Sequence, residues 1–248
     1  LAITSAGVIS GTPLNADVGA HTIVVTATDD DSTPASVTDT YILTVTSTND
    51  APTVTSTISD VSAAEDAAYS LDVSGTCTDV DVGDSLAYTI SGAPGDLAIS
   101  GTTITGTPVN ADVGAHTITV TCTDDSSAAA SASDDYILTV TNTNDAPTVA
   151  SAISDASTAE DAAYSLDASG TCADVDATDT LSYTISGGPS TITATTAGVI
   201  SGTPVNADVG THTITVTCSD GTASTTDAYD LTVTNTNDAP TVASAISD

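Results

Sequence analysis

Apolar and polar residues alternate along several stretches of the chain, and this alternation predicts β-strands. Residues 69–77, 116–122 and 136–140 each show a period of two residues, and turn-forming Gly, Pro and Asp separate them. An apolar row opposite a polar row is typical of a strand in a two-layered sandwich, so we expect an all-β chain. The rows expected to face the core are Tyr69, Leu71, Val73, Gly75 and Cys77, then His116, Ile118, Val120 and Cys122, then Tyr136, Leu138 and Val140.

Two motifs recur along the chain and reveal internal repeats. Asn-Ala-Asp-Val-Gly begins at Asn15, Asn110 and Asn206, and Asn-Asp-Ala-Pro-Thr-Val begins at Asn49, Asn144 and Asn237. The period of about 95 residues suits one small β-sandwich per repeat. We therefore expect the second half of a repeat, two complete repeats and the first strand of another, over residues 1–50, 51–145, 146–238 and 239–248. The missing front half indicates part of a longer array.

The charge of the chain excludes several classes of function. There are 33 Asp and Glu residues and no Lys or Arg, which gives a formal net charge of −33. Binding to nucleic acid or to anionic lipid is therefore not expected. Hydrophobic residues still make up 40% of the chain, which argues against a disordered acidic tail. No stretch approaches the roughly 18 continuous apolar residues that membrane insertion needs, and no signal peptide is visible.

Few residues are suited to catalysis. The three histidines, His21, His116 and His212, occupy one repeat position at the start of a strand, so they cannot converge on one site. We expect them to pack at the strand end rather than to bind a metal. Ser, His and Asp residues show no spacing that suggests a catalytic triad. The chain is therefore not expected to be an enzyme.

Two cysteines lie on the apolar rows of each complete repeat, 45 or 46 residues apart. This repeated placement favours disulfides between Cys77 and Cys122 and between Cys172 and Cys218, across the two sheets. Each would stabilise its repeat by roughly 3–4 kcal/mol. The alternative is buried free thiols. Disulfides would indicate an oxidising compartment, either extracellular or periplasmic.

Three stretches resemble a known family: residues 64–90, 104–124 and 136–147, with the elements Gly-Thr-Pro-x-Asn-Ala-Asp-Val-Gly and Asn-Asp-Ala-Pro. They resemble cadherin-like repeats of the dystroglycan type, which overlap with immunoglobulin-like repeats of very long microbial surface proteins. The resemblance implies seven-stranded Greek-key sandwiches joined end to end, often with calcium at each junction.

Acidic and amide residues are expected to gather at these junctions. The loops after the second and sixth strands should share the N-terminal end of a sandwich, beside the incoming linker. The resemblance to cadherins places the loop of Glu65 and residues 110–112 at the opposite end. The junction between the two complete repeats would use Glu65, Asn110, Asp112, Asn144, Asp145, Asp174, Asp176 and Asp220. The earlier junction would use Asn15, Asp17, Asn49, Asp50, Asp79, Asp81 and Asp124, and a later one Glu160, Asn206, Asp208, Asn237 and Asp238.

These oxygen-rich sets fit calcium, which takes six to eight oxygen ligands in irregular geometry. The chain departs from the cadherin pattern at Asn110, and at Ser47 and Asn142, where cadherins usually have Asp. The charge at each junction is therefore lower, which implies fewer or weaker ions. The alternative interpretation is that these Asp residues only form turns on a hydrated acidic surface.

The predicted function is mechanical. The segment would belong to a calcium-stiffened extracellular stalk, adhesin shaft or filament at the cell surface, with further repeats of the same chain, or other copies, as partners. The alternative is a ligand- or glycan-binding adhesion module, which would need a repeat with an exposed aromatic residue or a loop insertion. The two complete repeats are nearly interchangeable, which favours a spacer.

Overall fold

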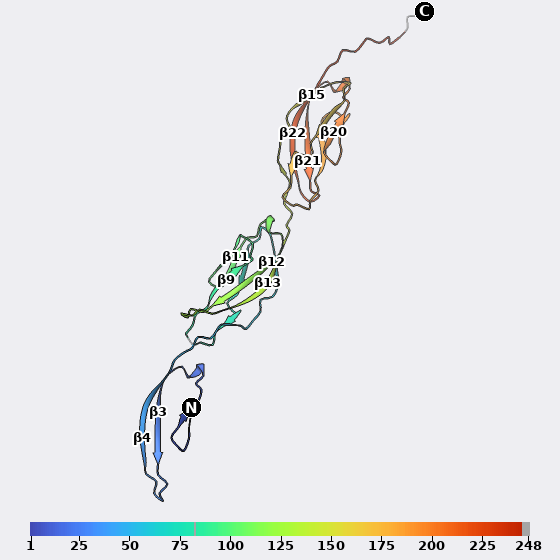
Figure 1. Ribbon diagram of the computed structural model, residues 1–248. Helices are drawn as coiled ribbons and strands as arrows, with labels where there is room; N and C mark the ends of the chain where they lie inside the picture. Colours follow the sequence, from blue (N-terminus) through green and yellow to red (C-terminus); the bar gives the residue numbers. More distant parts are fainter. Residues whose placement is uncertain (82, 245–248) are drawn as a thin grey trace, which may run out of the picture. The chain divides into compact units, whose positions relative to one another are not determined.

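The computed structural model describes residues 1–81 and 83–244, and the chain forms two compact units that meet in sequence after Thr141. Nearly all of the regular structure is β-strand (Figure 1). No helix within the described residues is long and apolar enough to cross a membrane.

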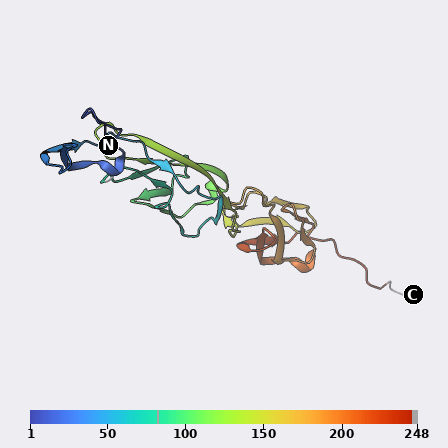
Figure 2. The ribbon, with the colours of Figure 1, turned by 90° about the horizontal axis from the view of Figure 1, so that it is seen from below.

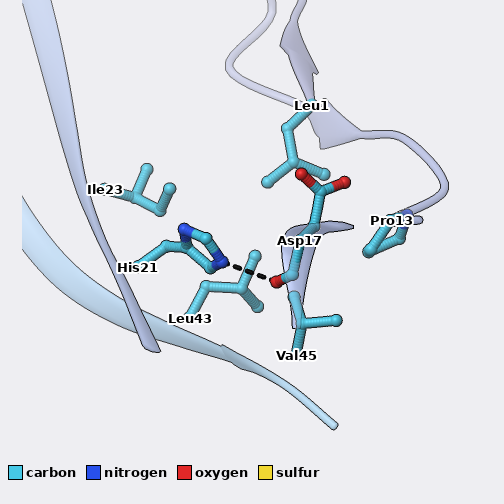
Figure 3. Close-up of a pocket in the computed structure, with 7 residues that line it drawn as sticks. All are labelled: Leu1, Pro13, Asp17, His21, Ile23, Leu43 and Val45. Atoms are coloured by element: carbon cyan, nitrogen blue, oxygen red, sulfur yellow. Dashed lines mark hydrogen bonds between the residues drawn. The ribbon is translucent and has the colours of Figure 1, made fainter. Parts of the chain in front are cut away.

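The first unit begins with the residues that were predicted to form the second half of a repeat. A short hairpin of β1 (Ala2–Ile3) and β2 (Ile9–Ser10) precedes the 3-10 helix η1 (Asn15–Asp17). A long antiparallel hairpin of β3 (Gly19–Thr28) and β4 (Ser36–Val45) follows. The apolar face of this hairpin is open among the described residues. Its residues His21, Ile23, Leu43 and Val45 line a pocket together with Leu1, Pro13 and Asp17, which precede the hairpin (Figure 3).

The complete repeat of the first unit is a sandwich of two main sheets. Its four-stranded sheet has the order β6-β13-β12-β9 and its three-stranded sheet the order β10-β11-β7, while β5 and β8 form a separate pair. The strands are β5 (Thr53–Val54), β6 (Val61–Ala64), β7 (Tyr69–Asp72), β8 (Cys77–Thr78), β9 (Ala87–Ser91), β10 (Leu97–Ser100), β11 (Thr103–Gly106), β12 (Gly114–Thr123) and β13 (Ser131–Thr141), with η2 (Asn110–Asp112) before β12.

The second unit repeats this arrangement. The sheets have the orders β15-β22-β21-β18 and β16-β20-β19, with a separate β14-β17 pair. The elements are β14 (Thr148–Val149), β15 (Ala156–Ala159), β16 (Tyr164–Asp167), β17 (Cys172–Ala173), β18 (Ser182–Gly187), β19 (Ile192–Ala194), β20 (Val199–Gly202), η3 (Asn206–Asp208), β21 (Gly210–Ser219) and β22 (Ser224–Thr234). Residues 235–244 then leave the sandwich as an extended segment without strand pairing (Figures 1 and 2). The rest of the predicted first strand of a further repeat, residues 245–248, lies outside the described residues.

The prediction of one continuous strand over residues 69–77 was wrong at residues 73–76. The chain pairs with β11 up to Asp72, turns at residues 73–76, and pairs again with β5 from Cys77. The Asp72 carboxylate causes this break, because it accepts hydrogen bonds from the Ser74 N–H at 2.9 Å and from the Ser74 hydroxyl at 3.1 Å. Such a local Asp bond competes with strand pairing. As a result Gly75 is exposed and Thr76 is buried, the reverse of the prediction.

The predicted alternation holds along the long strands. Ile118, Val120, Tyr136 and Leu138 are at most 1% exposed, while their neighbours in the sequence are exposed or half-buried. The hydroxyls of Tyr69 and Tyr136 lie 3.3 Å apart across the two sheets. Burial, together with this contact, raises the pKa of Tyr136 above its ordinary value. The pair of Tyr164 and Tyr229 repeats the arrangement at 3.2 Å. One tyrosine contact therefore joins the two sheets in each complete repeat.

Both predicted disulfides are confirmed. Cys77 bonds to Cys122 and Cys172 bonds to Cys218, and no free cysteine remains among the described residues. Cys122 and Cys218 are fully buried, so the cystines belong to the cores.

Candidate metal centre

Each Asn-Ala-Asp motif forms a single 3-10 turn that its own Asp caps. The Asp17 Oδ2 accepts a hydrogen bond from the Leu14 N–H at 2.9 Å, and Asp112 and Asp208 accept from Val109 and Val205 at 3.0 Å and 2.9 Å. One carboxylate oxygen of each predicted Asp ligand is therefore used within its own turn. The first residue of each turn is an asparagine: Asn15, Asn110 or Asn206.

The histidine of each repeat holds this turn against the following strand. The Nε2 atoms of His21, His116 and His212 lie 2.6–2.7 Å from the main-chain carbonyl oxygen of the Asp that ends the turn, namely Asp17, Asp112 and Asp208. Figure 3 shows this bond for His21. The histidines therefore have a structural contact at the strand end, as the sequence predicts.

The earlier junction lies wholly within the first unit and is centred on Asp81. This side chain is 8% exposed, and its Oδ2 accepts a hydrogen bond from the Asp50 N–H at 2.7 Å. Its Oδ1 accepts from the Ser47 hydroxyl at 3.1 Å and from Asn15 Nδ2 at 3.3 Å. Asn15 Nδ2 also lies 2.8 Å from Asp50 Oδ2. The half repeat, the linker and the next repeat thus meet at one carboxylate.

Two further predicted ligands join this junction from the loops of the complete repeat. Asn49 Nδ2 donates to Asp124 Oδ2 at 3.1 Å, and Asp124 is 4% exposed. Asp79 Oδ1 accepts from the Asp81 N–H at 2.9 Å. Carboxylate oxygens of Asp79, Asp81 and Asp84 all lie within 4.8 Å of one another. Two such charges repel by roughly 1–4 kcal/mol, depending on how much water separates them.

The second unit carries the equivalent contacts at the start of its sandwich. The Asp145 N–H donates to Asp176 Oδ2 at 2.8 Å, and Asn144 Nδ2 donates to Asp220 Oδ2 at 3.1 Å. Asp174, Asp176 and Asp179 form a second carboxylate cluster within 4.8 Å. Burial, and then the nearby negative charges of Asp176, Asp174 and Asp220, raise the pKa of Asp179. Both effects disfavour the charged form of a carboxyl group.

Asp220 behaves differently because its main-chain partners stabilise the charged form. The N–H groups of Ala223 and Thr222 donate to its Oδ1 and hold its pKa below the ordinary value. The pKa of Asp220 is therefore shifted in the direction opposite to that of Asp179.

The far ends of the sandwiches contain two buried glutamates. In the first unit Glu65 is 1% exposed, and its N–H donates to the Thr141 carbonyl at 3.0 Å, while Asp66 N–H donates to the Pro108 carbonyl beside η2. In the second unit Glu160 is 2% exposed and its Oε1 accepts from the Thr236 N–H at 2.8 Å. Asn206 Nδ2 donates to Asp238 Oδ2 at 3.1 Å, and Asn237 Nδ2 to the Asp238 carbonyl at 3.3 Å. Each unit thus brings its glutamate and the segment before its 3-10 turn to one end, and in the second unit the residues that follow β22 join them.

Several buried oxygens at these places have no hydrogen-bond partner in the described structure: Asn49 Oδ1, Asp79 Oδ2, Asp174 Oδ2 and Glu160 Oε2. A buried unsatisfied carboxylate oxygen is costly unless a cation or a donor reaches it. The chain has no Lys or Arg side chain that could do so. All of these atoms are hard oxygen donors, the type that calcium takes, so the residues present fit a calcium ion.

Asp84 and Asp179 are members of the clusters that the sequence analysis did not include. The signal that could have found them is the spacing Asp-x-Asp-x-x-Asp, which occurs at residues 79–84 and 174–179. The Ser47 hydroxyl also donates a hydrogen bond to Asp81. The sequence identified Ser47 only as a position where cadherins usually have Asp.

The sequence matches a family model described as a putative Ig domain over residues 1–46, 51–141 and 146–234. No curated protein matches the chain.

Among solved structures, mouse cadherin-23 EC22-24 is 20% identical, with a TM-score of 0.57, and the match covers 91% of this chain and 78% of that one. Protocadherin gamma B2 domains 1–5 are 18% identical, with a TM-score of 0.60 and coverage of 89% and 47%. These likenesses confirm the predicted cadherin-like and Ig-like sandwich fold.

An endo-fucoidan hydrolase of glycoside hydrolase family 107 is 26% identical, with a TM-score of 0.37, and the match covers 92% of this chain. The chain spans about a third of that enzyme's length, since the match covers 35% of it.

Proposed function

The chain belongs to the putative Ig domain family, and on that basis we propose that it is a non-enzymatic, structural segment of an extracellular stalk, adhesin shaft or filament that calcium stiffens at its junctions. One observation carries the proposal. Within the first unit, residues from the half repeat, the linker and the next repeat converge on Asp81, beside buried oxygens that lack partners.

Calcium would supply the positive charge that the chain lacks. Asp79, Asp81, Asp124 and Asp50 would provide carboxylate oxygens, and Asn15 and Asn49 would provide amide oxygens. Because these residues come from both sides of the linker, an ion shared among them would restrict bending there. The remaining predicted ligands in the second unit would serve the same purpose at their own junctions.

The similarity of the complete repeats supports a spacer rather than a module with one specialised site. Their strand orders, cystines, tyrosine pairs and 3-10 turns correspond one to one. The modest difference lies at residues 96–102 against 190–197, where the loop between β10 and β11 (residues 101–102) is shorter than its counterpart between β19 and β20 (residues 195–198). The disulfides support an oxidising, extracellular location. Further repeats of the same chain, or other copies, would be the partners.

Native mass spectrometry of the whole chain, with small-angle scattering in calcium and in chelator, tests this proposal. We expect several bound calcium ions and a stiffer particle in calcium. Asp81→Asn should remove the binding and stiffening at the first junction, because a charged ligand at its centre is lost. Asp135→Asn, an exposed change on β13, is the matched control. If wild type binds no calcium, or scatters identically in both conditions, the proposal is wrong.

A further inference from the structure

The cystine of each complete repeat lies directly before the two loops that carry its candidate metal ligands. Asp79 follows Cys77, and Asp124 follows Cys122, with one residue between them in each case. The second unit repeats both spacings, at Cys172 and Asp174 and at Cys218 and Asp220. Because each disulfide joins these cysteines, it connects the bases of the two ligand loops.

Strand pairing does not connect the bases of these two loops. Among the described residues, β8, which carries Cys77, pairs with β5 alone, over two residues. β12, which carries Cys122, lies in the four-stranded sheet between β13 and β9. β17 and β21 have the same places in the second unit. The cystine is therefore the covalent connection between two strands of different sheets, each of which leads into a ligand loop.

The linker that enters each complete repeat contacts both loops at once. In the second unit, the Asp145 N–H donates to Asp176 Oδ2 at 2.8 Å, and the neighbouring Asn144 Nδ2 donates to Asp220 Oδ2 at 3.1 Å. The first unit makes the equivalent contacts through Asp50 and Asn49. Because two successive linker residues each reach a different loop, the separation of the loops determines whether both contacts form together.

We propose that the cystine is the positioning element of these two loops, and through them of the calcium site at the start of each complete repeat. Groups behind the direct ligands commonly orient a metal site, and loops that are already held in place need less ordering when an ion binds. The inference rests on the proposed function for the ion itself. The positioning of the loops is a property of the chain without metal and can be tested by itself.

The two complete repeats differ in the other bonds that join their loops. In the first, Asp125 accepts hydrogen bonds from the Ser85 N–H at 3.1 Å and from the Ser85 hydroxyl at 2.6 Å. The Ser126 hydroxyl also donates to Asp84 at 3.0 Å. In the second unit Gly221 stands in the place of Asp125 and has no side chain that could accept such bonds. The second site should therefore depend on its cystine more strongly than the first.

Two-dimensional NMR of the whole chain during a calcium titration tests this inference at each site separately. The main-chain amides of Asp50 and Asp145 donate to the central carboxylate of their own site, so each signal reports on one site. The first-cystine variant carries Cys77→Ala and Cys122→Ala, and the second-cystine variant carries Cys172→Ala and Cys218→Ala. In each variant the repeat that keeps its cystine is the internal reference.

The expected losses differ between the two sites. Because ordering even one freed residue costs about a factor of 10 in affinity, the second-cystine variant should bind calcium at least about tenfold more weakly at its own site. The first-cystine variant should lose only about two- to threefold, because the hydrogen bonds of Asp125 and Ser126 still join its loops. No loss in the second-cystine variant would overturn the inference.

A matched control separates positioning of the loops from general stability. Ile200→Ala truncates a fully buried side chain on β20, outside both loops, and destabilises the same repeat while its cystine stays intact. Its calcium affinity should match that of wild type, and a loss equal to that of the second-cystine variant would overturn the inference. If circular dichroism shows that the second-cystine variant has unfolded, Cys172→Val with Cys218→Ala replaces it, because valine restores part of the lost core volume.

A further variant tests the contribution of the bonds between the loops. Asp125→Ala removes an exposed acceptor and keeps the cystine, so by itself it should change calcium affinity less than about twofold. Added to the first-cystine variant, it should lower the affinity of the first site at least about tenfold, because neither connection then remains. Additive effects would contradict the inference, since they would show that the cystine and these bonds do not hold the same two loops.

Hydrogen exchange in chelator separates this inference from the proposed function. Without calcium, the Asp145 N–H should exchange at least about tenfold faster in the second-cystine variant than in Ile200→Ala, because its acceptor Asp176 is no longer held in place. Equal exchange rates would refute the inference whatever the calcium titration shows. Faster exchange, in a chain whose wild type binds no calcium, would support the positioning of the loops and refute only the proposed function.

Discussion

Removal of the Cys172–Cys218 cystine should strongly destabilise its repeat. The double change Cys172→Ala and Cys218→Ala avoids leaving a hydroxyl in the core, where the two side chains are 7% and 0% exposed. The bond closes a loop with a sequence separation of 46 residues. Releasing a loop of this length gives the unfolded chain an entropy gain equivalent to about 4 kcal/mol at 25 °C. That is a large part of the 5–15 kcal/mol that typically stabilises a domain.

Urea denaturation followed by circular dichroism measures this loss. We expect the transition of one repeat to move to lower urea by the equivalent of about 4 kcal/mol, or its melting temperature to fall by roughly 15–30 °C. The repeat at residues 51–141 keeps its own cystine and is the internal reference. The matched variant Cys77→Ala and Cys122→Ala should exchange the roles of the two repeats. A loss below about 1 kcal/mol in either variant would refute the loop-entropy argument.

Three further changes test other contacts. Asn15→Asp should loosen the first junction in chelator, because an amide donor to Asp81 becomes a repelling charge, and should tighten calcium binding measured by calorimetry. Asp167→Ala should lower the urea midpoint at pH 7. Main-chain and hydroxyl donors lower the pKa of this carboxyl, so its contribution is present above the ordinary carboxyl pKa, and the difference from wild type should fade as pH falls through the lowered value. Tyr229→Phe should cost about 1 kcal/mol in urea denaturation, because the bond to Tyr164 is lost.

For each of these three substitutions, one result would contradict the physical reason given for it. Unchanged calcium binding in Asn15→Asp would show that this residue is no ligand. A difference for Asp167→Ala that survives at the lowest pH would indicate a packing effect rather than a charge effect. A neutral Tyr229→Phe would mean that the hydroxyl pair contributes nothing net.

The strands, repeats and cystines could be predicted because they depend on a strict period of two and on a repeat that places equivalent residues together. Tyr136, Leu138 and Val140 are buried as that period requires. The break at residues 73–76 could not be predicted from alternation, because it depends on a local hydrogen bond from the Ser74 N–H to the Asp72 carboxylate that the alternating pattern itself does not reveal. Hydrogen bonds between a side chain and the nearby main chain compete with strand pairing, and the period of two residues does not show which of them forms.

The candidate site could be predicted only in part, for a related reason. The sequence identified Asp79, Asp81 and Asp124, whose loops follow strands that end at the same end of the sandwich. It treated the Asp of each Asn-Ala-Asp turn as a ligand, whereas one oxygen of Asp112 caps the turn. It also omitted Asp84, which a further turn of the loop brings to the cluster. Loop conformation, rather than strand order, determines the positions of the Asp112 and Asp84 carboxylates.

Asparagine amides donate hydrogen bonds to the carboxylates at these places. In each case an amide nitrogen donates to a carboxylate: Asn15 to Asp50 at 2.8 Å, and Asn49 to Asp124, Asn144 to Asp220 and Asn206 to Asp238 at 3.1 Å. An uncharged amide removes the repulsion that an additional carboxylate would add, and it still offers an oxygen to an ion. Fewer charged ligands weaken calcium binding, and weak sites in the range of about 10⁻⁴–10⁻³ M are typical of extracellular modules. On the proposed function, these junctions would therefore respond to calcium at extracellular concentrations and would lose stiffness, without unfolding, when calcium falls.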